Sequence, residues 1–393
     1  MWDQDLEKAY LQQNPDVSDA VALGTVPSGY AHFMTWGYRE QRLWWSNTSR
    51  DLSGKLTRWC YDPWQYVEVG ARGGLKPCCN FSTLGMLPEN ADEWGELRNS
   101  GDFRKLRKEL LSGDLSAHCQ RCHIRETVPV DRLAQVLQTL SGSSSNERHL
   151  DPLPLTAVRI DINEKCNLRC DYCAASRLGY DGVEMSDDIF STVRLLLAQS
   201  VASADIHVNG HGETTFHPKW TEYCRRILNT GRNVHITTNF ARLYSDLEVR
   251  LLARFRTIQI SLDSDDAEMM RGIRKSVKVE NICENLRRVR RTSLLNNAPM
   301  PVISFSVGLY DPAIWRLESF TEFMINLGAQ TITFWNLVEM DHQTKVRALT
   351  HLNAEEKARV RVIVGRVRAR LDAAKVRYSF AGDISDGDGT PLV

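Results

Sequence analysis

The chain from residue 157 onward alternates short β-branched runs with longer amphipathic segments, and this alternation constrains the fold most strongly. The runs predict six strands: AVRIDIN, ADIHVNG, NVHITTN, TIQISLD, PVISFSV and QTITFWN. The amphipathic segments predict helices between them, near 187–200, 217–230, 246–254, 280–295 and 315–328. Strands that alternate with helices indicate βα units and a parallel sheet. Such units form either an open doubly wound sheet or a partial barrel, and periodicity does not separate the two.

Three cysteines, Cys166, Cys170 and Cys173, follow the first predicted strand in the stretch EKCNLRCDYC. A disulfide would leave one of them unpaired, so a shared metal centre is the better interpretation. Ligands bind at the carboxyl ends of the strands in either α/β architecture, which places these thiols on the expected active rim. Three thiolates can hold three corners of an iron–sulfur cube and leave the fourth iron open. The alternative is a zinc knuckle, which would need a fourth Cys or His, and none occurs between Lys165 and Val193 beyond these three.

The length, charge and cysteine content of the chain limit the functions that it can have. At 393 residues the chain exceeds the usual size of a single core, so two or more domains are expected. Lys plus Arg and Asp plus Glu both number 49, which gives no long-range field for nucleic acid or acidic lipid. No apolar run approaches the roughly 20 residues that span a bilayer, and the N-terminus does not resemble a signal peptide. We therefore expect a cytoplasmic protein without nucleic-acid or membrane partners, in which the ten cysteines are ligands or free thiols.

The spacing Cys-x3-Cys-x2-Cys, with Tyr172 before the last cysteine and a strand before the loop, resembles the signature of the radical S-adenosylmethionine (SAM) superfamily. The resemblance implies an α/β fold with a partial (β/α)6 TIM-like barrel and a catalytic [4Fe–4S] cluster on Cys166, Cys170 and Cys173. It also implies reductive cleavage of SAM to a 5′-deoxyadenosyl radical that abstracts hydrogen from an unactivated carbon. A reductase such as flavodoxin or ferredoxin would supply the electron.

Four later segments extend this resemblance. NGHGETTFHP resembles the Gly-Gly-Glu-Pro motif, with Thr214 in place of the usual proline, and HITTNF resembles the Thr-Asn-Gly segment. ISLDS resembles the serine–aspartate of the fourth strand, and MMRGIRKSVKVENICENL resembles a pattern whose arginine engages the methionine carboxylate. The resemblance therefore implies these cofactor-binding residues: Tyr172, Gly210, Gly212, Glu213, Thr238, Asn239, Ser261 and Arg274.

Simpler interpretations stay open at several positions. Asp263 could cap a helix, Arg274 could belong to a solvated basic face, and His211 could be a surface loop residue instead of a catalytic one. An aromatic residue in the sixth strand is more often core than an adenine contact. Of the spare thiols, Cys224 and Cys283 fit a buried core.

A second group of cysteines precedes the predicted barrel. GGLKPCC, the amphipathic segment FRKLRKELLSG and CQRC resemble the auxiliary-cluster module called SPASM, or its shortened relative. The resemblance implies a second [4Fe–4S] cluster on Cys60, Cys78, Cys119 and Cys122, with Cys78 preferred to Cys79 because it takes the usual place after the proline. The alternative is a zinc ribbon on the same thiolates. In the familiar members this module follows the barrel, whereas here it comes first.

The predicted domain order is a helical hairpin over 1–50, the Cys-rich auxiliary domain over 56–127, a linker over 128–155, the radical SAM core over 156–341, and a C-terminal helix and tail over 342–393. The hairpin resembles a short helical repeat found on bacterial glycosyltransferases and polysaccharide-biosynthesis proteins, and it could equally be a docking element. If that association counts, the substrate is a small molecule such as a sugar or a nucleotide sugar, undergoing dehydrogenation or epimerisation. The alternatives are a maturase acting on a ribosomally made peptide and a non-catalytic iron–sulfur carrier or sensor.

Overall fold

The computed structural model describes residues 7–8, 10–11, 14–33, 55–88, 90–122, 125–141, 150–275, 277–337 and 346–381. Most of the predicted hairpin over 1–50, the middle of the predicted linker and the tail beyond 381 lie outside these ranges. The described part of the first segment contains helices α2 (Pro15–Ala22) and α3 (Gly29–His32). Within the described ranges, no helix combines the length and the apolar character that crossing a membrane requires.

One ten-stranded sheet organises most of the molecule, in the order β12-β11-β10-β9-β8-β7-β6-β2-β3-β4. All six strands predicted from the sequence lie at its centre, each parallel to its neighbour. The predicted parallel α/β sheet is therefore confirmed. These strands are β6 (Leu155–Ile160), β7 (Ser200–Val208), β8 (Asn233–Thr238), β9 (Thr257–Ser261), β10 (Val302–Leu309) and β11 (Thr331–Asn336).

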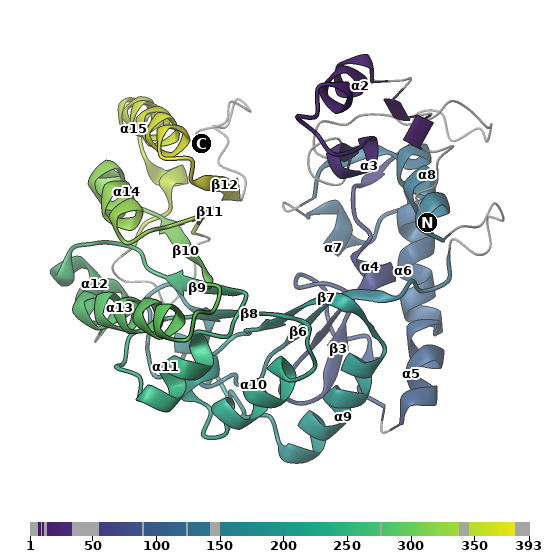
Figure 1. Ribbon diagram of the computed structural model, residues 1–393, viewed down its shortest axis with the longest axis horizontal. Coiled ribbons are helices and arrows are strands. Elements are labelled where there is room, and N and C mark those ends of the chain that lie inside the picture. The colour runs from purple at the N-terminus through teal and green to yellow at the C-terminus, as the bar shows by residue number, and fades with distance from the viewer. Residues whose placement is uncertain are drawn as a thin grey trace.

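Helices cover the outer side of this sheet, which curves into an arc (Figure 1). The five predicted helices are present as α9 (Asp187–Ala198), α10 (Trp220–Leu228), α11 (Asp246–Leu252), α13 (Val279–Leu295) and α14 (Leu317–Asn326), and α12 (Ala267–Arg274) lies between α11 and α13. Strand residues alternate in exposure, as in β8, where Val234 and Ile236 are buried and His235 between them is only partly buried. Because successive side chains point to opposite faces of a strand, the partly buried set faces the inner side of the arc.

The Cys-rich segment joins the same sheet. Strand β2 (Tyr66–Val69) pairs in parallel with β6, and β3 (Gly74–Lys76) and β4 (Gly85–Met86) continue the sheet in antiparallel order. A separate small sheet pairs β1 (Leu56–Arg58) with β5 (Thr127–Pro129). The helices of this segment are α4 (Asp62–Gln65), α5 (Ala91–Arg98), α6 (Gly101–Ser112) and α7 (Ala117–Gln120).

One helix and one edge strand were not among the elements predicted from the sequence. Helix α8 (Val130–Ser141) occupies part of the predicted linker over 128–155, because its apolar side chains are buried against the Cys-rich segment, with Leu133 and Leu137 packing near Trp64. At the other edge of the sheet, α15 (Ala354–Ala373) leads into β12 (Arg377–Ala381), which pairs in parallel with β11. A five-residue edge strand carries too short a pattern to be recognised without its partner.

Candidate active site

The three closely spaced thiols lie in the loop that follows β6. Cys170 is buried, whereas Cys166 and Cys173 are partly buried, and the three are near enough for their charges to interact. The backbone N–H of Leu168 lies 3.4 Å from Cys166 Sγ, as a donor would. The structure therefore brings Cys166, Cys170 and Cys173 together at the carboxyl end of the first core strand.

Burial controls the protonation of these thiols. It raises the pKa of Cys166 to about 11 and the pKa of Cys170 to about 12, and the nearby guanidinium of Arg274 opposes both rises. The metal-free thiols of Cys166 and Cys170 are therefore protonated at neutral pH. Metal ligands must be deprotonated, so loading this loop releases protons.

The buried ion pair of Asp263 and Arg274 fixes the side chain of Tyr172. Its Oη donates to Asp263 Oδ2 at 2.5 Å, and Arg274 Nε donates to the same oxygen at 2.7 Å. The backbone N–H of Gly308 donates to Asp263 Oδ1 at 3.0 Å. Arg274 is 5% exposed, so it does not belong to a solvated face. Asp263 is no helix cap either, because α12 is capped by Asp266, whose side chain accepts from the N–H groups of Glu268 and Met269.

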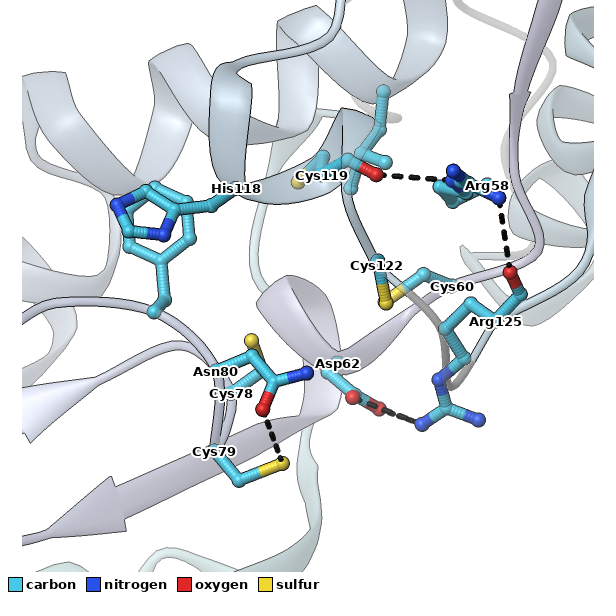
Figure 2. Close-up of a pocket in the computed structure, with 12 residues that line it drawn as sticks. Arg58, Cys60, Asp62, Cys78, Cys79, Asn80, His118, Cys119, Cys122 and Arg125 are labelled. Carbon is cyan, nitrogen blue, oxygen red and sulfur yellow. Dashed lines mark hydrogen bonds and ion pairs between the residues drawn. The ribbon is translucent and has the colours of Figure 1, made fainter. Parts of the chain in front are cut away.

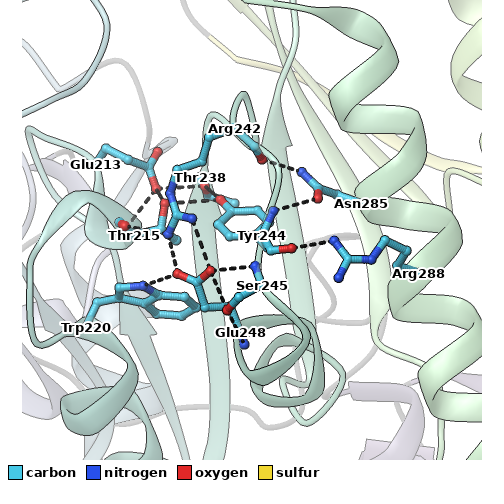
Figure 3. Close-up of polar contacts among 10 residues, drawn as sticks. All are labelled: Glu213, Thr215, Trp220, Thr238, Arg242, Tyr244, Ser245, Glu248, Asn285 and Arg288. Carbon is cyan, nitrogen blue, oxygen red and sulfur yellow. Dashed lines mark hydrogen bonds and ion pairs between the residues drawn. The ribbon is translucent and has the colours of Figure 1, made fainter.

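Glu213 joins the ends of β7 and β8 through hydrogen bonds (Figure 3). Its Oε1 accepts from the N–H of Thr215 at 3.0 Å, from Thr215 Oγ1 at 2.7 Å and from Thr238 Oγ1 at 2.7 Å, while its Oε2 accepts from the N–H of Asn239 at 2.7 Å. A carboxylate has about four acceptor positions, two on each oxygen. Three donors share Oε1, whereas Oε2 accepts only from the N–H of Asn239 and keeps a further acceptor position.

The motif NGHGETTFHP needs glycine at 210 and 212, because another loop approaches the backbone closely at both positions. A Cβ on Gly210 would lie 1.7 Å from Asp161 Cγ, and a Cβ on Gly212 would lie 2.3 Å from the carbonyl oxygen of Lys165. Real Cβ atoms do not approach other atoms so closely, so any side chain here would push the loop after β7 away from the loop after β6. The glycines thus allow the cysteine loop and the Glu213 loop to pack directly on each other.

Hydrogen bonds also join these two loops. The N–H of Glu213 donates to the carbonyl of Lys165 at 2.9 Å, and Asn163 Nδ2 donates to the carbonyl of Glu213 at 2.9 Å. From the end of β8, Asn239 Nδ2 donates to Asn167 Oδ1 at 2.9 Å and lies 3.9 Å from Cys166 Sγ. The predicted residues Glu213, Thr238 and Asn239 therefore form one connected unit with the thiol loop.

Phe240 stands where the resembling motif has glycine, and it adopts a left-handed backbone with φ 54°. This region costs an ordinary residue roughly 1–2 kcal/mol, which explains the preference for glycine. Here Asn285 of α13 compensates, because its Nδ2 donates to the carbonyls of Phe240 and Arg242 and its Oδ1 accepts from the N–H of Tyr244. Asn285 is fully buried, and nothing in its immediate sequence singled it out.

Asp161 is a second residue that the sequence analysis did not single out. It follows β6, it is 1% exposed, and its Oδ2 accepts from the N–H of His211 at 3.0 Å and lies 3.1 Å from His211 Nδ1. This hydrogen bond raises the pKa of His211, whose side chain is half exposed. His211 is therefore an oriented imidazole and not an unconstrained loop residue. The alternation in RIDIN, which places Arg159 and Asp161 on the inner face, was the available signal.

The remaining predicted contacts divide between the inner face and the core. Ser261 is partly buried and lies opposite Ser306 in the sheet register. Trp335 contacts Tyr172 edge-on with ring centroids 5.8 Å apart, and its Nε1 donates to Ser306 Oγ at 3.0 Å. Phe334 is fully buried, so of the two aromatic residues in β11 only Trp335 reaches this region.

The five cysteines between residues 60 and 122 meet in one pocket (Figure 2). Asp62 and Arg125 line the same pocket, and Arg125 Nη2 donates to Asp62 Oδ1 at 2.8 Å and to Oδ2 at 2.9 Å. Arg58 Nε donates to the carbonyl of Cys119 at 2.9 Å, which ties α7 to β1. Segments far apart in the chain thus converge on these thiols: Cys60, Cys78, Cys79, Cys119 and Cys122.

The neighbours of Cys78 and Cys79 differ. Burial raises the pKa of Cys78 to about 12, and its charge interacts with that of Cys119 and with that of Cys60. Cys79 is exposed, and its strongest charged neighbour is Arg159 of β6. Cys78 therefore faces the other thiols of the pocket, and Cys79 faces the main sheet.

The donor sets of the two thiol groups suit clusters. Among the described residues, no three His, Cys, Asp or Glu side chains lie close enough to share a single metal ion. An iron–sulfur cube does not need such convergence, since each thiolate binds a different iron. Of the spare thiols, Cys224 is fully buried in the core, as expected, and Cys283 is partly buried on α13.

Comparisons with known proteins give partial matches. The GTP 3′,8-cyclase of Chlorobaculum tepidum is 30% identical over 141 residues, which are 35% of this chain and 42% of that protein. The probable GTP 3′,8-cyclase of Pyrococcus abyssi is 26% identical over 168 residues, covering 42% of this chain and 53% of that protein. The chain thus spans about half the length of the curated relatives it matches.

Among solved structures, SuiB of Streptococcus suis bound to S-adenosylmethionine has a TM-score of 0.47 at 16% identity, and the match covers 85% of this chain and 74% of that one. The structure of anSMEcpe with bound AdoMet has a TM-score of 0.46 at 13% identity, covering 58% and 63% of the two chains. Residues 160–324 match the family model described as the Radical SAM superfamily. The matched segment carries the three thiols and the Glu213 loop.

Proposed function

We propose that the chain cleaves SAM reductively and directs the resulting radical to a carbon–hydrogen bond of a small-molecule substrate. One observation carries the proposal: the thiol loop after β6 and the Glu213 loop after β7 pack on each other through Gly212, and Asn239, which follows β8, is bonded to both. A thiol set that served only electron storage would not need the second and third loops to be organised around it.

Cys166, Cys170 and Cys173 would hold the catalytic cluster, because three thiols leave one iron for SAM. When bound, the cluster and SAM would supply the electron and the 5′-deoxyadenosyl radical. The backbone of 210–213, Thr238, Asn239 and Ser261 would then orient SAM at the carboxyl ends of β7 to β9. Tyr172 and Arg274 support the loop from the buried side, with Trp335 beside them.

Cys60, Cys78, Cys119 and Cys122 would hold a second [4Fe–4S] cluster in the pocket of the N-terminal half. The mutual proximity of Cys60, Cys78 and Cys119 supports this set, and the different surroundings of Cys79 support leaving it out. Four thiolates saturate a cube, so this cluster would transfer electrons or organise substrate. A zinc ribbon on the same thiolates is the alternative that metal analysis decides.

The substrate that we propose is a sugar or a nucleotide-bearing metabolite. Two sequence features point this way: the resemblance of the first segment to repeats on sugar-processing proteins, and the relatives named GTP 3′,8-cyclase. The inner face of the sheet offers partly buried polar side chains to such a ligand, including Gln259, Ser306 and Thr333. Dehydrogenation and epimerisation both begin with the same abstraction of hydrogen.

Anaerobic reconstitution tests the proposal directly. The protein is loaded with iron and sulfide, reduced with dithionite and given SAM, and 5′-deoxyadenosine is quantified. We expect its formation by the native chain and by Cys283→Ala, and no formation by Cys166→Ala. If the native chain forms no more than Cys166→Ala, the protein is a carrier or sensor and the proposal fails. GTP, a nucleotide sugar and a peptide are then compared as accelerators of cleavage.

Iron and zinc analysis of a variant with Cys60, Cys78, Cys119 and Cys122 all changed to alanine tests the second centre. Loss of about four irons per chain supports the cube. Loss of zinc instead would show the ribbon.

A further inference from the structure

The side chain between the second and third thiols is held by a buried charge pair. Tyr172 Oη and Arg274 Nε both donate to Asp263 Oδ2, at 2.5 and 2.7 Å, and all three side chains are buried. Asp263 is held in turn by the N–H of Gly308 at 3.0 Å. The thiol loop is thereby tied to the end of β9, to β10 and to the last turn of α12.

Two more contacts join the same partners. The N–H of Asp171 donates to the carbonyl of Ile273 at 2.8 Å, so the backbone next to Cys170 is bonded to the residue next to Arg274. The Arg274 guanidinium also lies 5.6 Å from the centre of the Tyr172 ring. Because Asp171 and Tyr172 are consecutive and both are bonded, this half of the thiol loop cannot rotate without breaking the hydrogen bond from Tyr172 to Asp263 or the backbone hydrogen bond from Asp171.

We propose that Asp263 and Arg274 are positioning residues that lock the Cys170–Cys173 half of the thiol loop through Tyr172 and place a buried positive charge beside the cluster held there. The reference to the cluster rests on the proposed function, whereas the locking of the loop does not. Arg274 is bonded to Asp263 and its guanidinium lies over the Tyr172 ring, so it acts on the loop through these two residues.

The chain provides a matched pair of tyrosines for the test. Tyr310, at the end of β10, is also fully buried, and its ring centroid lies 6.5 Å from that of Tyr172. Its hydroxyl has no hydrogen-bond partner among the described residues. Tyr172→Phe therefore removes the lock, whereas Tyr310→Phe removes a hydroxyl that makes no such bond.

The first experiment uses the full chain without metal and measures alkylation of Cys170 by iodoacetamide with mass spectrometry. We expect Tyr172→Phe to accelerate alkylation of Cys170 at least tenfold and Tyr310→Phe to leave it within twofold of the native rate. Equal rates for the two variants would overturn the lock, whether or not a cluster ever binds.

The second experiment measures the reduction potential of the cluster whose electron paramagnetic resonance signal changes when SAM is added. Arg274→Gln should make this potential more negative, since a nearby positive charge favours the reduced and more negative cluster. Arg274→Lys keeps the charge and should stay near the native value, as should Arg271→Gln, which changes an exposed arginine of the same helix. If Arg274→Gln and Arg274→Lys have the same reduction potential, the electrostatic role of Arg274 is overturned. A native chain without any SAM-responsive signal would instead refute the proposed function and leave the alkylation result to decide the lock.

Discussion

The N–H of Asn239 donates to Glu213 Oε2 at 2.7 Å and so joins the carboxyl end of β8 to that of β7. Glu213 is 3% exposed, and three further donors hold its other oxygen. Arg242 and Tyr244 extend the arrangement toward Glu248 and Asn285 (Figure 3). The rim at the carboxyl ends of β7 and β8 is therefore organised by contacts within the protein.

Glu213→Gln should destabilise the protein by about 2–3 kcal/mol, because an amide nitrogen cannot accept from the buried donors of Thr215, Thr238 or Asn239. Urea denaturation of the metal-free chain measures this change. Glu284→Gln, at a partly exposed position on α13, serves as the control and should change stability by less than about 0.5 kcal/mol. Equal stability of the two variants would contradict the bracing role of Glu213.

Gly212→Ala should separate the thiol loop from the Glu213 loop, because the added Cβ would lie 2.3 Å from the carbonyl oxygen of Lys165. We expect a cost of about 1–3 kcal/mol and reduced iron retention after desalting. The matched change is Gly365→Ala in α15, where a Cβ meets nothing within 4 Å. That variant should retain iron and gain about 0.5–1 kcal/mol from its better helix propensity. Normal iron retention in Gly212→Ala would refute the close approach.

The His211–Asp161 pair should titrate. The hydrogen bond to Asp161 raises the pKa of His211 above its ordinary value of 6.5, and Lys76 and Glu68 also influence it. Because the folded pKa lies above the unfolded one, His211 contributes stability that is fully present below the unfolded pKa and is lost as pH rises through the folded pKa. NMR titration of the His211 ring measures this directly. Asp161→Asn should lower the pKa of His211. Asp205→Asn changes the hydrogen-bond partner of His235, which lies 3.1 Å from it, and should leave the pKa of His211 unchanged.

Cys78 and Cys79 should differ as ligands. Cys78→Ala should remove about four irons per chain from the second centre, whereas Cys79→Ala should retain them. Iron and sulfide analysis after anaerobic reconstitution measures the difference. Loss of iron in Cys79→Ala with retention in Cys78→Ala would reverse the assignment.

Loading of this second centre should also depend on pH. Burial raises the pKa of Cys78 to about 12, so the metal-free thiol is protonated at neutral pH and must lose its proton to bind iron. We expect iron incorporation to be faster at pH 9 than at pH 7, as followed by absorbance during reconstitution. A rate independent of pH would show that thiol deprotonation does not limit loading.

The alternation of strands and helices between 157 and 337 and the spacing of Cys166, Cys170 and Cys173 could be read from the sequence, because both are local properties. Period-2 and helical patterns depend on neighbouring residues, and the three thiols share one loop. Gly210, Gly212 and Glu213 could be located by the resemblance of NGHGETTFHP to the Gly-Gly-Glu-Pro motif after the second predicted strand. The strands and helices expected from these patterns are present in the structure.

Only the tertiary structure decided which distant residues meet. The pairing of β2 with β6 joins the Cys-rich segment to the main sheet, and it depends on backbone hydrogen bonds between segments about ninety residues apart. The partners of Arg274 and His211, which are Asp263 and Asp161, are likewise set by packing at the strand ends. The sequence by itself therefore determined the strands and helices between 157 and 337 and the thiol spacing. The tertiary structure determined the contacts, because burial and charge pairing exist only when separate segments come together.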